Sequence, residues 1–475
     1  MGRGAMGRSM ALFTSLALAQ RSISLLLLPF VTRAMSAEEY GIVSILTAAG
    51  ALLPTLLGSA VEQGVFRATV RGDQNQDTSQ RNVLSAAWWW LAVLGPAICF
   101  LAAGLLLLHG ESILQVPASL WAIEIAAAGL NLLPFGFAMP RLRARQRLAR
   151  FTVVAATSIL VGLISKIVLV VALGGGALGW VITDLITAGA TLIASLFLVQ
   201  RPRYGRARSG AANLARYAAP LIPHTLSFWA FSSLSRPLMA LVMPLADVGT
   251  YSVALNAASV GLLVLNEINR AATVSYAADQ APALSPRTLG LMRVQLWSGV
   301  GVTVLTCSLA PAFATYIIPS TYEGVVQILA ILSLQPLLWS VYVLPINVLT
   351  QTVGNTTWNW TASVSATLVM AAGTIVLGSV YGATGAAVAG VLGYGVMALA
   401  AHILIRLESV RIQWRAAGLG WPFALGGGTI AVSVVAITYL DSSVLLRSVV
   451  VGAAWTALGF VGYAIRSSRR NAPGD

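Results

Sequence analysis

Long apolar stretches follow one another along the whole chain, and each is long enough to cross a bilayer. A helix needs about 20 apolar residues to span the hydrocarbon core. About fourteen such windows lie near residues 10–32, 40–65, 83–108, 117–140, 151–173, 177–199, 217–243, 249–275, 290–315, 323–350, 358–379, 382–405, 420–440 and 443–465. Backbone groups in lipid must be hydrogen-bonded within the element, and no alternating, barrel-like pattern occurs. We therefore expect an all-α polytopic membrane protein.

The composition excludes several other classes of protein. Of the 475 residues, 57% are apolar and only 9% are charged, whereas about a quarter of the residues in soluble domains are charged. The mean hydropathy is +0.81, so a soluble enzyme, a secreted disulfide scaffold and a disordered chain are excluded. Cys99 and Cys307 each lie inside an apolar window, and no His/Cys cluster has metal-ligand spacing.

The basic residues fall on one side of this map. If the amino terminus is cytoplasmic, 24 of the 29 Lys and Arg residues lie in cytoplasmic segments, near 1–9, 66–82, 141–150, 200–216, 270–293, 406–419 and 466–475. Cytoplasmic loops of membrane proteins are enriched in Lys and Arg in this way. We therefore expect both termini in the cytoplasm and the protein in the cell membrane. The net charge of +14 then needs no nucleic-acid partner.

The first window also resembles a secretory signal. Arg3 and Arg8 precede the apolar run 10–18, and Ala17-Leu18-Ala19 resembles a cleavage site. Cleavage there would leave residues 22–31 as an apolar remnant too short to span. We favour an uncleaved first helix that runs through Arg21.

A short phrase occurs twice in the sequence. Glu39-Tyr40-Gly41-Ile42-Val43-Ser44 opens the second window, and Asp247-Val248-Gly249-Thr250-Tyr251-Ser252 opens the eighth. Both windows also end in similar phrases, Arg67-Ala68-Thr69-Val70 and Arg270-Ala271-Ala272-Thr273-Val274. Internal repeats of this kind are typical of transporters. We predict an N-lobe of helices 1–6 in residues 1–200, a basic cytoplasmic linker in 201–216, a C-lobe of helices 7–12 in 217–405, and helices 13–14 with a cytoplasmic tail in 406–475.

The residues around the repeated phrase resemble a known family. Leu28-Pro29-Phe30-Val31-Thr32-Arg33, the run from Met35 to Gly41, the Gly58 to Arg67 end of the second window and the run from Arg236 to Ser252 resemble the Wzx-type polysaccharide flippases. These flippases belong to the multidrug/oligosaccharidyl-lipid/polysaccharide exporter superfamily. The resemblance implies two six-helix lobes around a central cavity, alternating access, and outward movement of an undecaprenyl-pyrophosphate-linked oligosaccharide.

Ionisable residues inside the windows are candidates for function, because each costs about 2.5–3.5 kcal/mol to insert. Arg21 is centred in the apolar stretch 11–31, about 15 Å from either end. It needs a buried carboxylate, a water-filled cavity or an anionic ligand. Arg236 opens the second half as Arg21 opens the first. Arginine's paired donors suit a phosphate, so our central hypothesis is that both guanidinium groups bind one pyrophosphate.

Four ionisable residues share a depth. Glu124, Lys166, Asp184 and Arg236 each lie seven residues from the expected outer end of a window, which is roughly 10 Å below the surface. Lys166 and Asp184 are on adjacent helices, so an ion pair between them is expected. Alternatively, Lys166 lines a cationic cavity with the two arginines, and Asp184 or Glu124 carries a coupling proton or Na⁺.

Two further features concern movement. Glu267 and Arg270 are three residues apart near the inner end of the eighth window, so they form either an interfacial pair or an inner gate. Pro220, Pro223 and Pro237 bunch in the seventh window, which makes that helix the expected bending element.

We favour a flippase for a lipid-linked oligosaccharide, with membrane lipid, and in the cell a polysaccharide polymerase and glycosyltransferases, as partners. A lipid II flippase, a teichoic-type exporter and a cation-coupled multidrug antiporter of the same superfamily remain open. A membrane-embedded glycosyltransferase using the outer-loop acids Glu38 and Glu39 is disfavoured, because the repeat explains Glu39 as a residue at the start of a helix. We expect no cofactor and no enzymatic activity.

Overall fold

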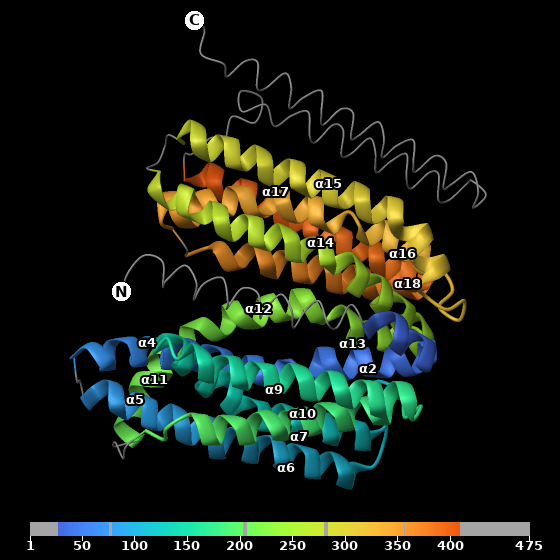
Figure 1. Ribbon diagram of the computed structural model, residues 1–475. Helices are drawn as coiled ribbons and strands as arrows, with labels where there is room; N and C mark the ends of the chain where they lie inside the picture. Colours follow the sequence, from blue (N-terminus) through green and yellow to red (C-terminus); the bar gives the residue numbers. More distant parts are fainter. Residues whose placement is uncertain (1–26, 76–77, 203–206, 280–283, 356, 409–475) are drawn as a thin grey trace, which may run out of the picture. The chain divides into compact units, whose positions relative to one another are not determined.

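The computed structural model describes residues 27–75, 78–202, 207–279, 284–355 and 357–408. In this part of the chain all regular secondary structure is helical, apart from a single bridge between Ile113 and Val116. The chain divides into two compact units, Met1–Gly249 and Thr250–Asp475. Within each unit the helices run alongside one another (Figure 1).

The first unit is a bundle of long helices interrupted by π-helical turns. After a helical stretch at 27–34, its membrane-spanning part comprises α2 (Ala37–Gly50), α3 (Leu52–Pro54), η1 (Thr55–Ser59), α4 (Ala60–Asn75), α5 (Thr78–Trp89), η2 (Trp90–Leu94), α6 (Gly95–His109), α7 (Ala118–Leu133), η3 (Pro134–Ala138), α8 (Met139–Ala144), α9 (Leu148–Lys166), η4 (Ile167–Ala172) and α10 (Gly176–Leu198). Its core packs Leu91, Phe137 and Val154 with no exposed surface, whereas Leu108 and Phe197 are more than four-fifths exposed. Large apolar side chains on the outside fit a chain whose solvent is lipid.

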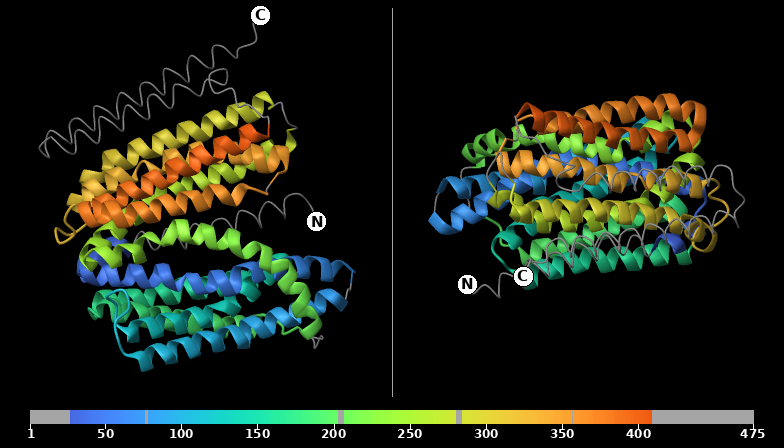
Figure 2. Two further views of the ribbon diagram at one scale, coloured as in Figure 1. Left: turned by 180° about the vertical axis from the view of Figure 1, so that it is seen from behind. Right: turned by 90° about the horizontal axis from the view of Figure 1, so that it is seen from above.

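The predicted seventh helix is broken, as the bunched prolines suggested. It consists of α11 (Ala207–Ala218), the 3₁₀ turn η5 (Ala219–Leu221), α12 (Ile222–Ser233) and α13 (Ser235–Val242). Pro220 lies in the turn and Pro223 at the start of α12, where proline removes backbone donors. The bend at η5 is visible in Figure 2. In this segment α11 contacts α4 and α5, α12 contacts η1, and α13 contacts α2. The whole segment therefore packs against the other helices of the first unit.

The second unit contains α14 (Leu245–Ala278, whose first turn belongs to the first unit), α15 (Pro286–Tyr316), α16 (Val325–Leu332), α17 (Gln335–Asn347), η6 (Val348–Val353) and α18 (Asn359–Leu407). Its core includes Met292, Leu296 and Leu344 with no exposed surface.

The 49 residues of α18 are two helices joined at Gly382. That residue has φ 58° and ψ −142°, a region open only to glycine. Across the turn, a side-chain carbon at residue 373 would touch Ala389, and one at residue 385 would touch the carbonyl of Leu377. The two halves therefore fold back on each other as an antiparallel pair, which matches the two windows predicted at 358–379 and 382–405.

The repeated phrase lies where two helices cross. α2 starts with a capping box, in which Ser36 accepts a hydrogen bond from the amide of Glu39 and Glu39 accepts one from the amide of Ser36. Glu39 is thus the helix-start residue that the repeat predicted. A side-chain carbon at Gly41 would overlap the carbonyl of Leu245, and one at Gly249 would overlap the carbonyl of Ala37. The two contacts are reciprocal between equivalent positions, so glycine at both allows the backbones to touch.

The windows predicted the membrane helices closely. Within the described ranges, nine helices are long and apolar enough to cross a membrane, and the hairpin of α18 divides the last of them into two. The window at 217–243 is the broken segment α11–α13. The windows at 420–440 and 443–465 and most of the first window lie outside the described residues, so the count of fourteen and the position of the termini stay predictions. The predicted lobes also stay a prediction, because repeats and packing units need not coincide.

Candidate functional site: a charged cavity in the first unit

The first unit contains a half-open cavity of about 350 Å³ between its membrane-spanning helices. Helices α2, α3, α7, α9 and α10 surround it, with Leu27 and the π-helical turn η3. Its polar lining comprises Thr47, Glu124, Asn131, Ser158, Lys166, Asp184 and Thr187. A cavity of this size with a few converging polar groups is the usual form of a small-molecule or ion site.

Three of the four residues predicted to share a depth line this cavity. Glu124 of α7, Lys166 at the end of α9 and Asp184 of α10 all line it. The Lys166 Nζ lies 3.5 Å from Oδ1 of Asp184, which confirms the ion pair expected between adjacent helices. It also lies 3.7 Å from the centre of the Trp180 ring, where a cation is attracted by the electrons of the ring face.

Glu124 is the most buried ionisable group of the cavity. It is 9% exposed, and its Oε2 has no hydrogen-bond partner among the described residues. The absence of a side chain at Gly50 leaves room for it, since a side-chain carbon there would lie 2.7 Å from Oε1 of Glu124. Two carboxyl groups face one ammonium group, so the cavity lacks one positive charge when all three are ionised. A proton or a monovalent cation would supply that charge.

The helices become irregular where they border the cavity. Pro54 ends α3 before η1, Phe135 lies in η3, and Lys166 is the last residue of α9 before η4. Short π-helical turns are frequent at functional sites because they re-aim side chains and free backbone carbonyls. Proline explains the turns near Pro54 and Pro134, because it cannot donate the helical hydrogen bond. No proline explains η4 after Lys166.

The other predicted site residues lie elsewhere. Arg236 is half-buried on α13 and is not among the residues that line this cavity. Arg21 lies outside the described residues. Glu267 and Arg270 form the expected pair on α14, with 2.8 Å between Oε1 and Nη1. Since the Arg270 side chain is 65% exposed, the pair has the character of a surface pair.

A polar cluster in the second unit was missed from the sequence. The Oδ1 of Asn269 accepts hydrogen bonds from Gln295, at 2.7 Å, and from Asn347, at 2.6 Å. Tyr276 donates to Gln295 at 2.6 Å. These residues come from α14, α15 and α17, and the signal was the presence of amide side chains inside three apolar windows. Satisfied buried networks of this kind fix how helices pack.

A second missed interaction holds the inner end of the first unit. Arg143 of α8 lies 3.2 Å from Glu62 of α4, and the buried Arg141 donates to the carbonyl of Gln200 at 2.6 Å. Both arginines were counted only as cytoplasmic charges. Positions so far apart in sequence give no local signal of such a contact.

The sequence of the chain matches one known protein family. The family described as "Polysaccharide biosynthesis protein" matches residues 30–281. No curated protein sequence matches the chain.

Solved structures show the same fold at low identity. A structure of the lipid II flippase MurJ, in an inward closed conformation, is 13% identical with a TM-score of 0.70, covering 96% of this chain and 100% of that one. An inward-facing multidrug resistance MATE family transporter of the MOP superfamily is 13% identical with a TM-score of 0.66, covering 82% and 94%. An outward-facing MATE transporter is 15% identical with a TM-score of 0.57, covering 84% and 95%. The chain thus has the fold of these membrane transporters and is itself a multi-pass protein of the cell membrane. With more than half of its length matched by the family, the chain belongs to the polysaccharide biosynthesis protein family.

Proposed function

We propose that the protein is a flippase, not an enzyme, and that it moves an undecaprenyl-pyrophosphate-linked oligosaccharide from the inner to the outer leaflet by alternating access. The observation that carries this proposal is membership of a polysaccharide biosynthesis family in a chain with a transporter fold. Such a pathway needs one membrane protein that carries a large polar glycan across the hydrocarbon of the bilayer. The polymerase and the glycosyltransferases that would act beside it stay a prediction.

The charged cavity suits the coupling role in this cycle. With Glu124, Asp184 and Lys166 all ionised, the cavity has one uncompensated negative charge, which one proton or Na⁺ would neutralise. Binding that cation would remove the excess negative charge from the spans, which favours whichever conformation closes the cavity to water. Lys166 would hold Asp184 ionised in both states.

The pyrophosphate contacts are proposed for Arg21 and Arg236. Each opens one half of the sequence, and a guanidinium group offers two parallel donors to a phosphate. Arg236 does not line the coupling cavity, so at least its contact with the cargo would lie apart from the cation.

The decisive experiment measures flipping in liposomes. Protein reconstituted with a fluorescent undecaprenyl-pyrophosphate oligosaccharide should move the label to the leaflet where a membrane-impermeant quencher reaches it. Arg21→Ala and Arg236→Ala should abolish this movement, and Arg147→Ala, at an exposed arginine outside the spans, should not. Full flipping by both the Arg21→Ala and the Arg236→Ala variants would refute the pyrophosphate hypothesis. Failure of the wild type to move the lipid would refute the proposed cargo.

A cation-coupled multidrug antiporter is the second candidate, because the cavity contains two carboxyl groups, Glu124 and Asp184. An antiporter needs such groups to exchange a cation for its substrate. Dye efflux driven by an imposed proton or Na⁺ gradient, without any lipid cargo, would favour this function. Flipping of lipid II or of a teichoic-type precursor in the same liposomes would show that one of these lipids is the cargo instead.

A further inference from the structure

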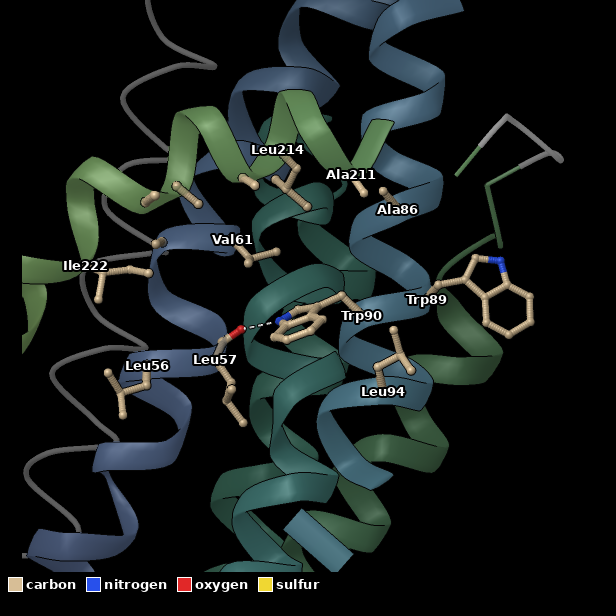
Figure 3. Close-up of a pocket in the computed structure, with 14 residues that line it drawn as sticks. Leu56, Leu57, Val61, Ala86, Trp89, Trp90, Leu94, Ala211, Leu214 and Ile222 are labelled. Atoms are coloured by element: carbon tan, nitrogen blue, oxygen red, sulfur yellow. Dashed lines mark hydrogen bonds between the residues drawn. The ribbon is translucent and has the colours of Figure 1, made fainter. Parts of the chain in front are cut away.

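An apolar groove of about 490 Å³ lies in the first unit and shares no lining residue with the charged cavity. It is bordered by η1 and α4, by α5 and η2, and by the bent segment from α11 to α12 (Figure 3). All of its lining residues are apolar, among them Val61, Ala86, Leu94, Ala211 and Ile222. The polar atom of Trp90 is already used, because its Nε1 donates to the carbonyl of Leu57 at 2.7 Å. The groove therefore suits a hydrocarbon chain and offers nothing to water.

A small polar pocket of about 180 Å³ adjoins this groove. It is lined by Arg67, Arg71, Gln80, Asn213 and Tyr217, and it shares the buried Leu214 with the groove. The Arg67 guanidinium lies 4.9 Å from the centre of the Tyr217 ring. Among the residues whose side chains the structure describes, no carboxylate forms a salt bridge with Arg67 or Arg71. The pocket can therefore accept an anion with several oxygen acceptors.

The two pockets are stacked in order of membrane depth. The polar pocket uses residues 64–71 and 79–83, next to the turn between α4 and α5, whereas the groove uses residues 56–61 and 86–94, farther along both spans. From Ala86 to Leu94 the groove follows the helix for about 12 Å. One leaflet of hydrocarbon is about 15 Å thick, so the groove has the length of one leaflet. The arginine distribution predicts that this end of the spans is cytoplasmic.

We propose that the two pockets together form a binding site for an anionic phospholipid of the surrounding bilayer. Arg67 and Arg71 hold its phosphate headgroup at the interface, and one acyl chain fills the groove between α5 and α11. A free phosphate would leave the groove empty, and the polyprenyl chain of the proposed cargo is far longer than one leaflet. The lipid joins the bent segment α11–α12 to α4 and α5. The site does not depend on the identity of the cargo.

The experiment maps photo-crosslinks on the full-length protein in detergent. Phosphatidylglycerol with a photoreactive acyl chain should label peptides from residues 86–94 and 211–222, and phosphatidylcholine with the same chain should label them much less. Arg67→Gln with Arg71→Gln should weaken phosphatidylglycerol labelling by about 30-fold, the effect of removing two basic groups beside an anionic headgroup. The matched control is Arg81→Gln with Arg147→Gln, two exposed arginines that line neither pocket.

A second pair of variants tests the groove and does not alter charge. Ala211 and Ala212 are neighbouring, exposed residues of α11, and only Ala211 lines the groove. Ala211→Phe should abolish labelling at residues 86–94, and Ala212→Phe should leave it unchanged. Equal labelling by the two phospholipids, or labelling unaffected by both the arginine pair and Ala211→Phe, would overturn the proposal. Displacement of the phosphatidylglycerol probe by an equimolar amount of inorganic phosphate would also overturn it, because the site would then bind an anion alone. Displacement of the probe by an equimolar amount of undecaprenyl pyrophosphate would instead assign the site to the cargo.

Discussion

Alanine in place of Gly41 should destabilise the first unit, because the added carbon overlaps backbone atoms of Leu245. Overpacking costs about 1–3 kcal/mol, and backbone neighbours cannot rotate away, so we expect about 2–3 kcal/mol here. Alanine has a higher helix propensity than glycine, which offsets about 1 kcal/mol of this loss of stability. The net loss is then about 1–2 kcal/mol, which lowers the Tm by roughly 2–8 °C for a unit of this size.

Thermal unfolding of the purified protein, followed by tryptophan fluorescence at one fixed heating rate, measures this loss. Gly189→Ala is the matched control, since Gly189 lies inside α10 and a side-chain carbon there meets no atom within 4 Å. The control should be as stable as the wild type or up to about 1 kcal/mol more stable.

The reciprocal geometry adds a second test. Gly249→Ala should cost about as much as Gly41→Ala, because each added carbon meets the backbone of the other helix. Once one carbon has separated the helices, the second has less to displace, so the double variant should lose less than the sum of the two. Strict additivity, or a Gly41→Ala variant as stable as Gly189→Ala, would refute the description of this crossing.

Three further predictions concern other parts of the chain. Gly382→Ala should lower the yield of monodisperse protein, because a φ of 58° with a ψ of −142° costs any other residue about 1–3 kcal/mol. Lys166→Met should destabilise the protein strongly, and adding Asp184→Leu should restore part of the loss, since the single variant leaves a carboxylate without its cation. Tyr276→Phe should lower the free energy of unfolding by about 1–3 kcal/mol, measured by thermal unfolding, because Gln295 loses its donor.

A specific result would contradict each of these three predictions. Gly395→Ala, inside α18 with no atom nearby, should express normally, and the same yield from both glycine variants would contradict the role of the turn. A double variant at Lys166 and Asp184 that is as unstable as the sum of the singles would contradict their coupling. An unchanged Tm for Tyr276→Phe would show that its hydroxyl group contributes nothing to the cluster.

Helix positions and depths could be predicted from the sequence, because both follow from local rules. Apolar length gives each span, and a rise of about 1.5 Å per residue converts a position into a depth. That conversion placed Glu124, Lys166 and Asp184 at one level, and the structure brings them to one cavity. Depth alone does not fix direction around the helix axis, and Arg236, expected at the same level, does not line this cavity.

The remaining contacts depend on which helices become neighbours. Asn269, Gln295 and Asn347 come from three helices, and nothing near any one of them in sequence indicates the others. The same holds for Arg143 and Glu62, which are 81 residues apart. The π-helical turn after Lys166 itself contains neither proline nor glycine, so no residue within it predicted the irregularity.

The turn at Gly382 has a consequence for any study of motion in this protein. A single residue joins two antiparallel helices whose backbones touch near Gly385, so the pair has no slack in which one helix could slide past the other. Spectroscopic labels placed on the two helices should report a constant separation throughout a transport cycle. Epitope tags inserted at this turn should disrupt folding, and accessibility reporters belong at other loops.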